Sequence, residues 1–139
     1  EGIQRIYYTS ESDNEATLVL IYAHSFGGVM DSFLLQTPSR YSYESLTPSS
    51  LLRAPYNKFI EATSKSSNLD GIIKRFTYGA LSGLLERMAE LQCFSSEERF
   101  KSLLKRSPHV LQLIPHKYLA NYLGIDPTNF SKFLNTVKI

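Results

Sequence analysis

The sequence lacks the features on which several classes of protein depend. Cys93 is its single cysteine, which excludes an internal disulfide and a cysteine-based metal site. No apolar run approaches the roughly 18 residues that a membrane-spanning helix needs. Residues 1–5 show no basic start of a secretory signal peptide. These absences favour a cytoplasmic protein without a membrane segment.

The side chains of a typical enzyme site are also scarce. The histidines are His24, His109 and His116, and the last two lie in the half of the chain that reads as helical. A small enzyme on a cupin-like barrel would need clustered metal ligands, and no nucleophile–base pair is visible. We therefore predict no enzyme, no catalytic residue and no metal ligand, and we interpret His24 as a loop residue.

Basic and acidic side chains nearly balance, with a net charge of +2, but they are distributed unevenly along the chain. Residues 1–69 hold five basic and seven acidic side chains, whereas residues 70–139 hold ten basic and six acidic ones. A basic half suits a polyanionic partner, because contacts to phosphates supply most of the affinity for nucleic acid. A surplus of this size is also common on a solvated helical surface.

The first third of the chain has the pattern of β structure. Residues 3–8 and 16–23 are two apolar, β-rich runs on either side of a polar loop, which predicts a hairpin. Residues 29–35 fit a short helix or a turn. Residues 41–46 and 50–54 predict two more short strands, separated by Pro48.

Helical spacing begins at Pro55, and a long helix is predicted over residues 69–92. Its apolar residues recur at steps of three and four, and they are Leu69, Ile72, Ile73, Phe76, Ala80, Leu84, Met88 and Leu91. Two glycines within this stripe suggest close approach by another backbone. The stripe packs either against a second copy of the chain or against the protein's own strands. The predicted dimer interface is Ile72, Phe76, Gly79, Ala80, Gly83 and Leu84, and Cys93 beyond it is interpreted as a small buried side chain.

Residues 95–134 carry the most specific pattern, which is that of a helix-turn-helix. Ser95 and Glu98 have the spacing of a capping box at the start of a helix that ends before Pro108. In residues 115–134, Ala120 supplies the small residue where two helices cross, and Gly124 accepts a positive φ in the turn. Asp126 and Pro127 start the second helix. The residues expected to fill the wedge are Leu119, Leu123, Ile125, Phe130 and Phe133. An ordinary pair of antiparallel helices is the alternative.

The second helix of such a motif enters the major groove of DNA, and the first contacts the backbone. We expect Thr128, Asn129 and Lys132, with Ser131 nearby, to face the bases. Asparagine can pair with adenine and lysine can reach guanine. We expect Lys117 and Tyr118, together with His116, to contact phosphates.

These residues resemble the C-terminal half of Crp/Fnr-type transcription regulators, in a branch common in Bacteroidetes-like bacteria. The resemblance lies in Ser95–Phe100 and Pro115–Leu134. It is looser in Gly2–Tyr8, Phe26–Gly28 and Thr37–Ser42, which are similar to the second half of a cyclic-nucleotide-binding β-roll. It implies an α+β fold with a partial cupin-like β-roll and short helix (1–66), a dimerisation helix (67–93) and a winged-helix-like helix-turn-helix domain (94–139). It also implies that about a third of a complete regulator precedes Glu1, and that the β-roll does not close on its own.

The resemblance further implies a small effector, held by Phe26, Gly27, Gly28, Val29, Ser39, Arg40 and Ser42. Nucleotide-binding members have a glutamate where this chain has Gly28, and Ser39 rather than Arg40 falls at the position of their arginine. Loss of the carboxylate removes a hydrogen bond worth about 1.5–3 kcal/mol. No cofactor is therefore certain, and cyclic AMP is less favoured than a different effector or none. The recognition helix departs too, with Thr128 for the family's glutamate and Lys132 for its arginine.

The resulting hypothesis is a homodimeric regulator that binds a pseudo-palindromic DNA duplex, with RNA polymerase left open as a further partner. The alternative is a ligand-sensing or scaffold protein of the same fold, whose degenerate helix-turn-helix does not bind DNA. The modest charge and the missing arginines motivate this alternative. Replacing Lys132 by alanine separates the two, because only a DNA-reading helix depends on that side chain.

Overall fold

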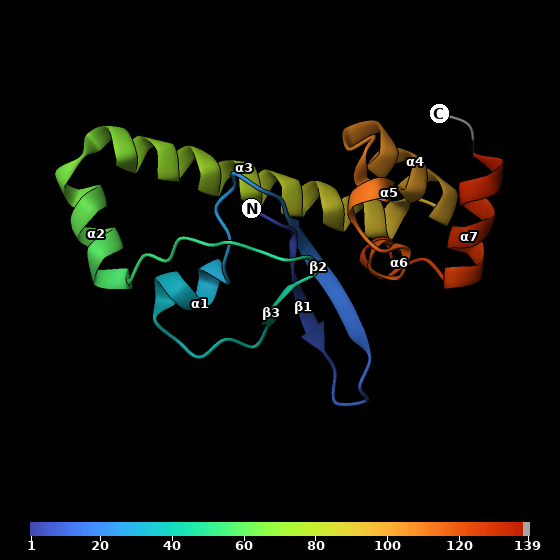
Figure 1. The fold of residues 1–139 in the computed structure, drawn as a ribbon, viewed down its shortest axis with the longest axis horizontal. Coiled ribbons are helices and arrows are strands. Elements are labelled where there is room, and N and C mark those ends of the chain that lie inside the picture. Colours follow the sequence, from blue (N-terminus) through green and yellow to red (C-terminus); the bar gives the residue numbers. More distant parts are fainter. Residues whose placement is uncertain (138–139) are drawn as a thin grey trace. The chain divides into compact units, whose positions relative to one another are not determined.

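The computed structural model describes residues 1–137 and has the α+β composition that the sequence predicts (Figure 1). The strands are β1 (Gln4–Thr9), β2 (Glu15–Ile21) and β3 (Ser42–Ser45). The helices are α1 (Met30–Leu35), α2 (Tyr56–Lys65), α3 (Ser67–Cys93), α4 (Ser96–Arg106), α5 (Val110–Leu113), α6 (His116–Leu123) and α7 (Pro127–Thr136). The last two residues of the predicted segment 94–139 lie outside the described part of the chain. Within residues 1–137, no helix combines the length and the apolarity needed to cross a lipid bilayer.

The chain divides into two compact units. Glu1–Leu51 belong to the same unit as the residues from Phe94 onward, and Leu52–Cys93 form the other. The division into 1–66, 67–93 and 94–139, which the resemblance implies, stays a prediction.

The first unit contains a three-stranded antiparallel sheet in the order β2–β1–β3. β1 and β2 form the predicted hairpin, in which Gln4 pairs with Ile21 and Thr9 with Glu15. The register shifts where Ile6 pairs with Val19 and Tyr7 with Thr17, which leaves Leu18 as a bulge. β2 is therefore an edge strand with a local twist.

The strand predicted over residues 50–54 is wrong. Ser50 exchanges two hydrogen bonds with Glu1, but the pairing goes no further, and residues 51–54 are exposed without regular structure. Pro48 and Pro55 flank this stretch, and a proline cannot donate to a strand ladder. The strand predicted over residues 41–46 is confirmed at its centre, because β3 spans Ser42–Ser45.

The second unit consists of α2 packed on α3. α2 begins directly after Pro55, and Ser66 accepts a hydrogen bond from the Leu69 amide at the start of α3. α3 extends from Ser67 to Cys93, slightly beyond the predicted range at both ends. Cys93 is exposed, so its interpretation as a buried residue is wrong. It lies in the last turn of the helix, off the apolar stripe.

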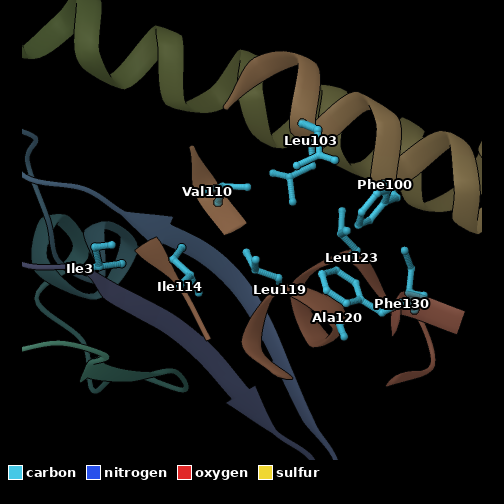
Figure 2. Close-up of a cluster of buried hydrophobic side chains, with 11 residues drawn as sticks. Ile3, Phe100, Leu103, Val110, Ile114, Leu119, Ala120, Leu123 and Phe130 are labelled. Carbon is cyan, nitrogen blue, oxygen red and sulfur yellow. The ribbon is translucent and has the colours of Figure 1, made fainter. Parts of the chain in front are cut away.

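One hydrophobic core in the first unit joins the sheet to the C-terminal helices (Figure 2). Its largest fully buried side chains are Phe100, Phe130, Leu104, Leu119, Leu123 and Val110. Ile3 contributes from the start of the sheet, and Leu20, Tyr22 and Leu46 pack around the edge. Full burial of side chains of this size contributes about 1.5–3 kcal/mol each. The helix-turn-helix is thus held on the sheet by shared apolar packing.

Candidate nucleic-acid interface

The turn between α6 and α7 depends on the conformation of Gly124. Its φ of 61° and ψ of 42° are left-handed, as the sequence predicts. The Gly124 N–H donates to the carbonyl of Asn121 at 3.1 Å, and the Ile125 N–H donates to that of Ala120 at 2.9 Å. This pair of bonds is the Schellman arrangement, which satisfies the last carbonyls of a helix. α6 therefore stops cleanly, and the chain changes direction.

α7 starts as a separate helix with its own cap. The Asp126 carboxylate accepts from the amides of Thr128 at 2.8 Å and Asn129 at 3.4 Å. Pro127 occupies the first turn, where its missing N–H costs nothing. The negative cap also suits the positive end of the helix dipole.

Aromatic packing sets the crossing of α7 over the preceding helices. The ring of Phe130 lies edge-on to that of Phe100 with centroids 5.3 Å apart, and the ring of Phe133 lies 5.7 Å from Phe100. Ala120 is 2% exposed at the place where the sequence predicts a small residue. The predicted wedge is buried at Leu119, Leu123 and Phe130 (Figure 2). Ile125 is buried as well, and Phe133 packs at the margin of the cluster.

Arg99 ties α4 to this turn. Its guanidinium donates to the carbonyl of Gly124 at 3.1 Å and to the carbonyl of Phe94 at 2.9 Å. Arg99 falls inside the motif Ser95–Phe100, but no spacing in the sequence indicates this role. The contact spans 25 residues, so no local pattern could have indicated it.

The side chains predicted to face bases all lie on the exposed side of α7. Thr128, Asn129, Ser131 and Lys132 are exposed, whereas Phe130 between them is buried. The Ser131 hydroxyl donates to the Pro127 carbonyl at 3.0 Å, so part of its hydrogen-bonding capacity is used inside the helix. In the part of the chain that the structure describes, the side chains of Asn129 and Lys132 make no hydrogen bond or ion pair. They are available to an outside partner.

The residues predicted to contact phosphates divide into two groups. His116 and Lys117 are exposed at the start of α6, with Lys117 Nζ lying 4.6 Å from the centre of the Tyr118 ring. Tyr118 is half-buried and turns toward the sheet, where the Arg5 guanidinium lies 4.6 Å from its ring. Lys117 is therefore open to solvent, as a phosphate contact requires, whereas Tyr118 is engaged within the protein.

Arg5 is a buried cation that links the three strands. It is 4% exposed, and it donates to Glu44 at 2.6 Å, to Glu15 at 2.9 Å and to Thr17 at 3.2 Å. Burial by itself lowers the pKa of Arg5, but the hydrogen bonds to Glu44 and Glu15 outweigh burial and leave the pKa raised above its ordinary value. Arg5 thus stays charged, and it holds Glu15 and Glu44 on the face that carries α6.

The two segments predicted to hold an effector approach each other at one point. A side chain added at Gly27 would meet the Tyr43 hydroxyl at 2.8 Å, so this segment lies against the start of β3. Burial raises the pKa of Tyr43. Phe26 is 50% exposed, and Arg40 and Ser42 are exposed as well. The Ser39 hydroxyl accepts a hydrogen bond from the Tyr41 amide at 2.9 Å, which forms a local turn.

Gly28 cannot simply be exchanged for the glutamate of nucleotide-binding proteins. Its φ is +141°, a backbone conformation that side chains of L-residues rarely adopt, although space for a side chain is open. Val29 follows as the residue before α1. A separate open groove of about 420 Å³ is lined by Thr47 and residues 111–116, on the helical side of the unit. The predicted effector residues do not line this groove.

The predicted dimer residues lie along α3, and several are open to solvent. Ile72 is 39% and Leu84 50% exposed, and Gly79, Ala80 and Gly83 are exposed as well, whereas Phe76 is half-buried. Side chains added at Gly79 or Gly83 would meet nothing within 4 Å in the described structure. The close approach that these glycines suggest is therefore not made by the described residues of this chain. Within residues 1–137, no three acidic, cysteine or histidine side chains gather as metal ligands would.

No protein-family model matches the chain, and no curated protein matches it. Solved structures do match. A protein described as a Crp/Fnr-family transcriptional regulator from Eubacterium rectale superposes with a TM-score of 0.70 at 16% identity, over 97% of this chain and 65% of the other. FixK2 from Bradyrhizobium japonicum gives 0.73 at 14% identity, over 96% and 69%. A protein described as a cAMP-binding regulatory protein from Silicibacter pomeroyi gives 0.58 at 21% identity, over 95% and 61%.

At these identities the likeness establishes the fold. The chain has the architecture of Crp/Fnr-type regulators, with a β-roll segment followed by helices, as the sequence predicts. It spans about two thirds of the length of the proteins it matches. The proteins from Eubacterium rectale and Silicibacter pomeroyi are described as regulators, and none of the three is described as an enzyme.

Proposed function

We propose that the chain is part of a Crp/Fnr-family transcription regulator that binds double-stranded DNA through α7. The observation that carries the proposal is the separate, capped helix α7, whose Thr128, Asn129 and Lys132 are exposed beside a buried Phe130. This is the arrangement in which a recognition helix presents its N-terminal residues to base edges. Lys117 on α6 supplies a cation for a flanking phosphate.

The regulator acts as a homodimer paired through α3. The apolar side chains Leu81, Leu84, Leu85 and Met88 are each at least half exposed, and Leu91 is 45% exposed. A row of this kind on one helix is unfavourable in water unless a partner covers it. A twofold dimer presents two recognition helices, which explains why a pseudo-palindromic site is expected.

A small effector bound between the Phe26–Val29 segment and the start of β3 would adjust DNA binding. The contact of Gly27 with Tyr43 brings these segments together, and the left-handed backbone at Gly28 disfavours the glutamate that would hold a ribose. The effector is therefore of a class other than cyclic AMP. A regulator of this kind acts in the cytoplasm, and a contact with RNA polymerase stays open.

The test is binding to DNA selected from a genomic library at low salt. We expect the chain to enrich a pseudo-palindromic duplex, with log Kd rising linearly with log salt at about 0.9 per phosphate neutralised. Lys132→Ala should weaken binding to the selected site by about 1–3 kcal/mol and relax the preference at one base position. Lys65→Ala is the matched control, because Lys65 is an exposed lysine of α2 whose Nζ lies 2.7 Å from Glu61.

Two results would contradict the proposal in different ways. If no duplex is enriched at low salt, the chain does not bind DNA, and the ligand-sensing or scaffold alternative is favoured. Binding that is equally weakened by Lys132→Ala and Lys65→Ala indicates attraction to charge alone, without reading by α7.

A further inference from the structure

Beside the apolar packing, one side chain of α6 forms two hydrogen bonds with the backbone of the sheet. The Thr17 N–H donates to Asn121 Oδ1 at 2.6 Å, and Asn121 Nδ2 donates to the Glu15 carbonyl at 2.7 Å. Asn121 is separated from these residues by more than 100 positions in the sequence. No local pattern in the sequence indicates this contact.

The strand that receives Asn121 has an open edge. β2 is at the border of the sheet, and the backbone groups of Thr17 and Glu15 that Asn121 uses are those that a further strand would take. An asparagine carries a donor and an acceptor on one planar group, as a peptide unit does. Asn121 thus replaces a neighbouring strand over one pair of residues, and it covers an edge that would otherwise bind water or another chain.

A second contact lies one turn earlier on α6. Tyr118 rests on the buried Arg5, which joins β2 through Glu15 and β3 through Glu44. Glu44 follows two residues after Ser42, the last residue of the predicted effector segments. The face of the sheet that carries α6 is therefore bonded directly to the strand that leaves the predicted effector site.

We propose that Asn121 is a positioning residue, which seats α6 on the β2 edge so that the sheet determines how α7 is presented to DNA. The proposal rests on the proposed function. The position of α7 depends on that of α6, because the Gly124 turn and the core around Phe130 join the two helices. Lys117, Asn129 and Lys132 are exposed while Asn121 is bonded to β2, and the proposal takes this state as the one that binds DNA.

The contact of Asn121 with the β2 edge is tested by amide hydrogen exchange on the intact chain. The Thr17 amide should be protected, and Asn121→Ala should accelerate its exchange at least about tenfold, because an edge amide without a partner is open to water. The amides of Leu123 and Phe130 should keep their protection, which shows that the helix-turn-helix stays folded. Asn135→Ala is the matched control, since the Asn135 side chain donates to the Ser131 carbonyl within its own helix. If the exchange rate of the Thr17 amide is unchanged in Asn121→Ala, Asn121 does not hold α6 on the β2 edge.

The positioning role is tested on the duplex selected by the unmodified chain. Asn121→Ala should weaken its binding about 5- to 30-fold without changing the preferred bases, because a smaller fraction of molecules is seated. Asn121→Asp keeps the size of the side chain but loses the donor to Glu15, and it should weaken binding in the same direction. Unchanged or tighter binding in both variants overturns the proposal, as does an altered base preference. If the unmodified chain selects no duplex, the proposed function fails, whereas the Thr17 exchange still reports on the seat.

Discussion

At the scale of single residues, the helix-turn-helix depends on groups that have one specific local task. Gly124 accepts a left-handed backbone, Asp126 caps α7 and Arg99 holds the turn from α4. None of these tasks requires contact with DNA. Substitution at these positions should therefore affect stability first, and binding only through the fraction of folded chain.

Gly124→Ala should lower the free energy of unfolding by about 1–2 kcal/mol, because a side chain at a φ of 61° crowds the following carbonyl. Urea denaturation followed by circular dichroism measures the change. Gly71→Ala is the matched control within a helix. A side chain added at Gly71 meets nothing, and alanine is a better helix former, so this variant should gain up to about 1 kcal/mol. Equal stability of the two variants would contradict the role of the turn.

At the scale of elements, α4 shows how a helix start can depend on pH. The Ser95 side chain accepts from the Glu98 amide at 3.3 Å, and the Ser95 amide donates to the Glu98 carboxylate at 2.8 Å. Hydrogen bonds with the Ser95 side chain, and then with its backbone, hold the pKa of Glu98 below its ordinary value of 4.5. The ionised carboxylate is thus favoured in the folded state.

The stabilisation from Glu98 should be complete above its unfolded pKa, and it should be lost as the pH falls through the lower folded pKa. The difference in Tm between the unmodified chain and Glu98→Gln should therefore be largest near neutral pH and shrink in acid. Glu11→Gln controls for the loss of one negative charge, because Glu11 is exposed in the loop between β1 and β2. A Tm difference that grows as the pH falls would show that the carboxylate does not act as a cap.

The elements that the sequence predicts well are those whose signals lie within a few residues. Ser95 with Glu98, and Asp126 with Pro127, mark the starts of α4 and α7, because caps act on the nearest amides. The exposed side chains of α7 followed from the same spacing. The contacts of Asn121 with β2 and of Arg99 with Gly124 could not be predicted, because they join distant segments and involve residue types that are common at protein surfaces. The false strand at residues 50–54 arose from a local pattern that no partner strand completes.

At the scale of the whole molecule, the chain separates into two compact units with different surfaces. The unit that contains the sheet and α4–α7 buries its large side chains in one core. The unit of α2 and α3 exposes Leu81, Leu84, Leu85 and Met88 by 50% or more, and none of its aliphatic or aromatic side chains is fully buried. Exposure of an apolar row of this kind to water is unfavourable, and a second copy of the chain is the proposed cover.

If that partner is a second copy of the chain, a charge on the apolar row should separate the copies. Leu84→Glu should raise the dissociation constant of the dimer at least about tenfold, because each copy loses the burial of a leucine and gains a charge to desolvate. Sedimentation velocity over a range of concentrations measures this shift. Ser82→Glu adds the same charge about 200° away around α3, and it should leave the association unchanged. If both variants associate as tightly as the unmodified chain, α3 does not form the dimer interface. If the unmodified chain is monomeric at all concentrations, a second copy of the chain does not bury the apolar row.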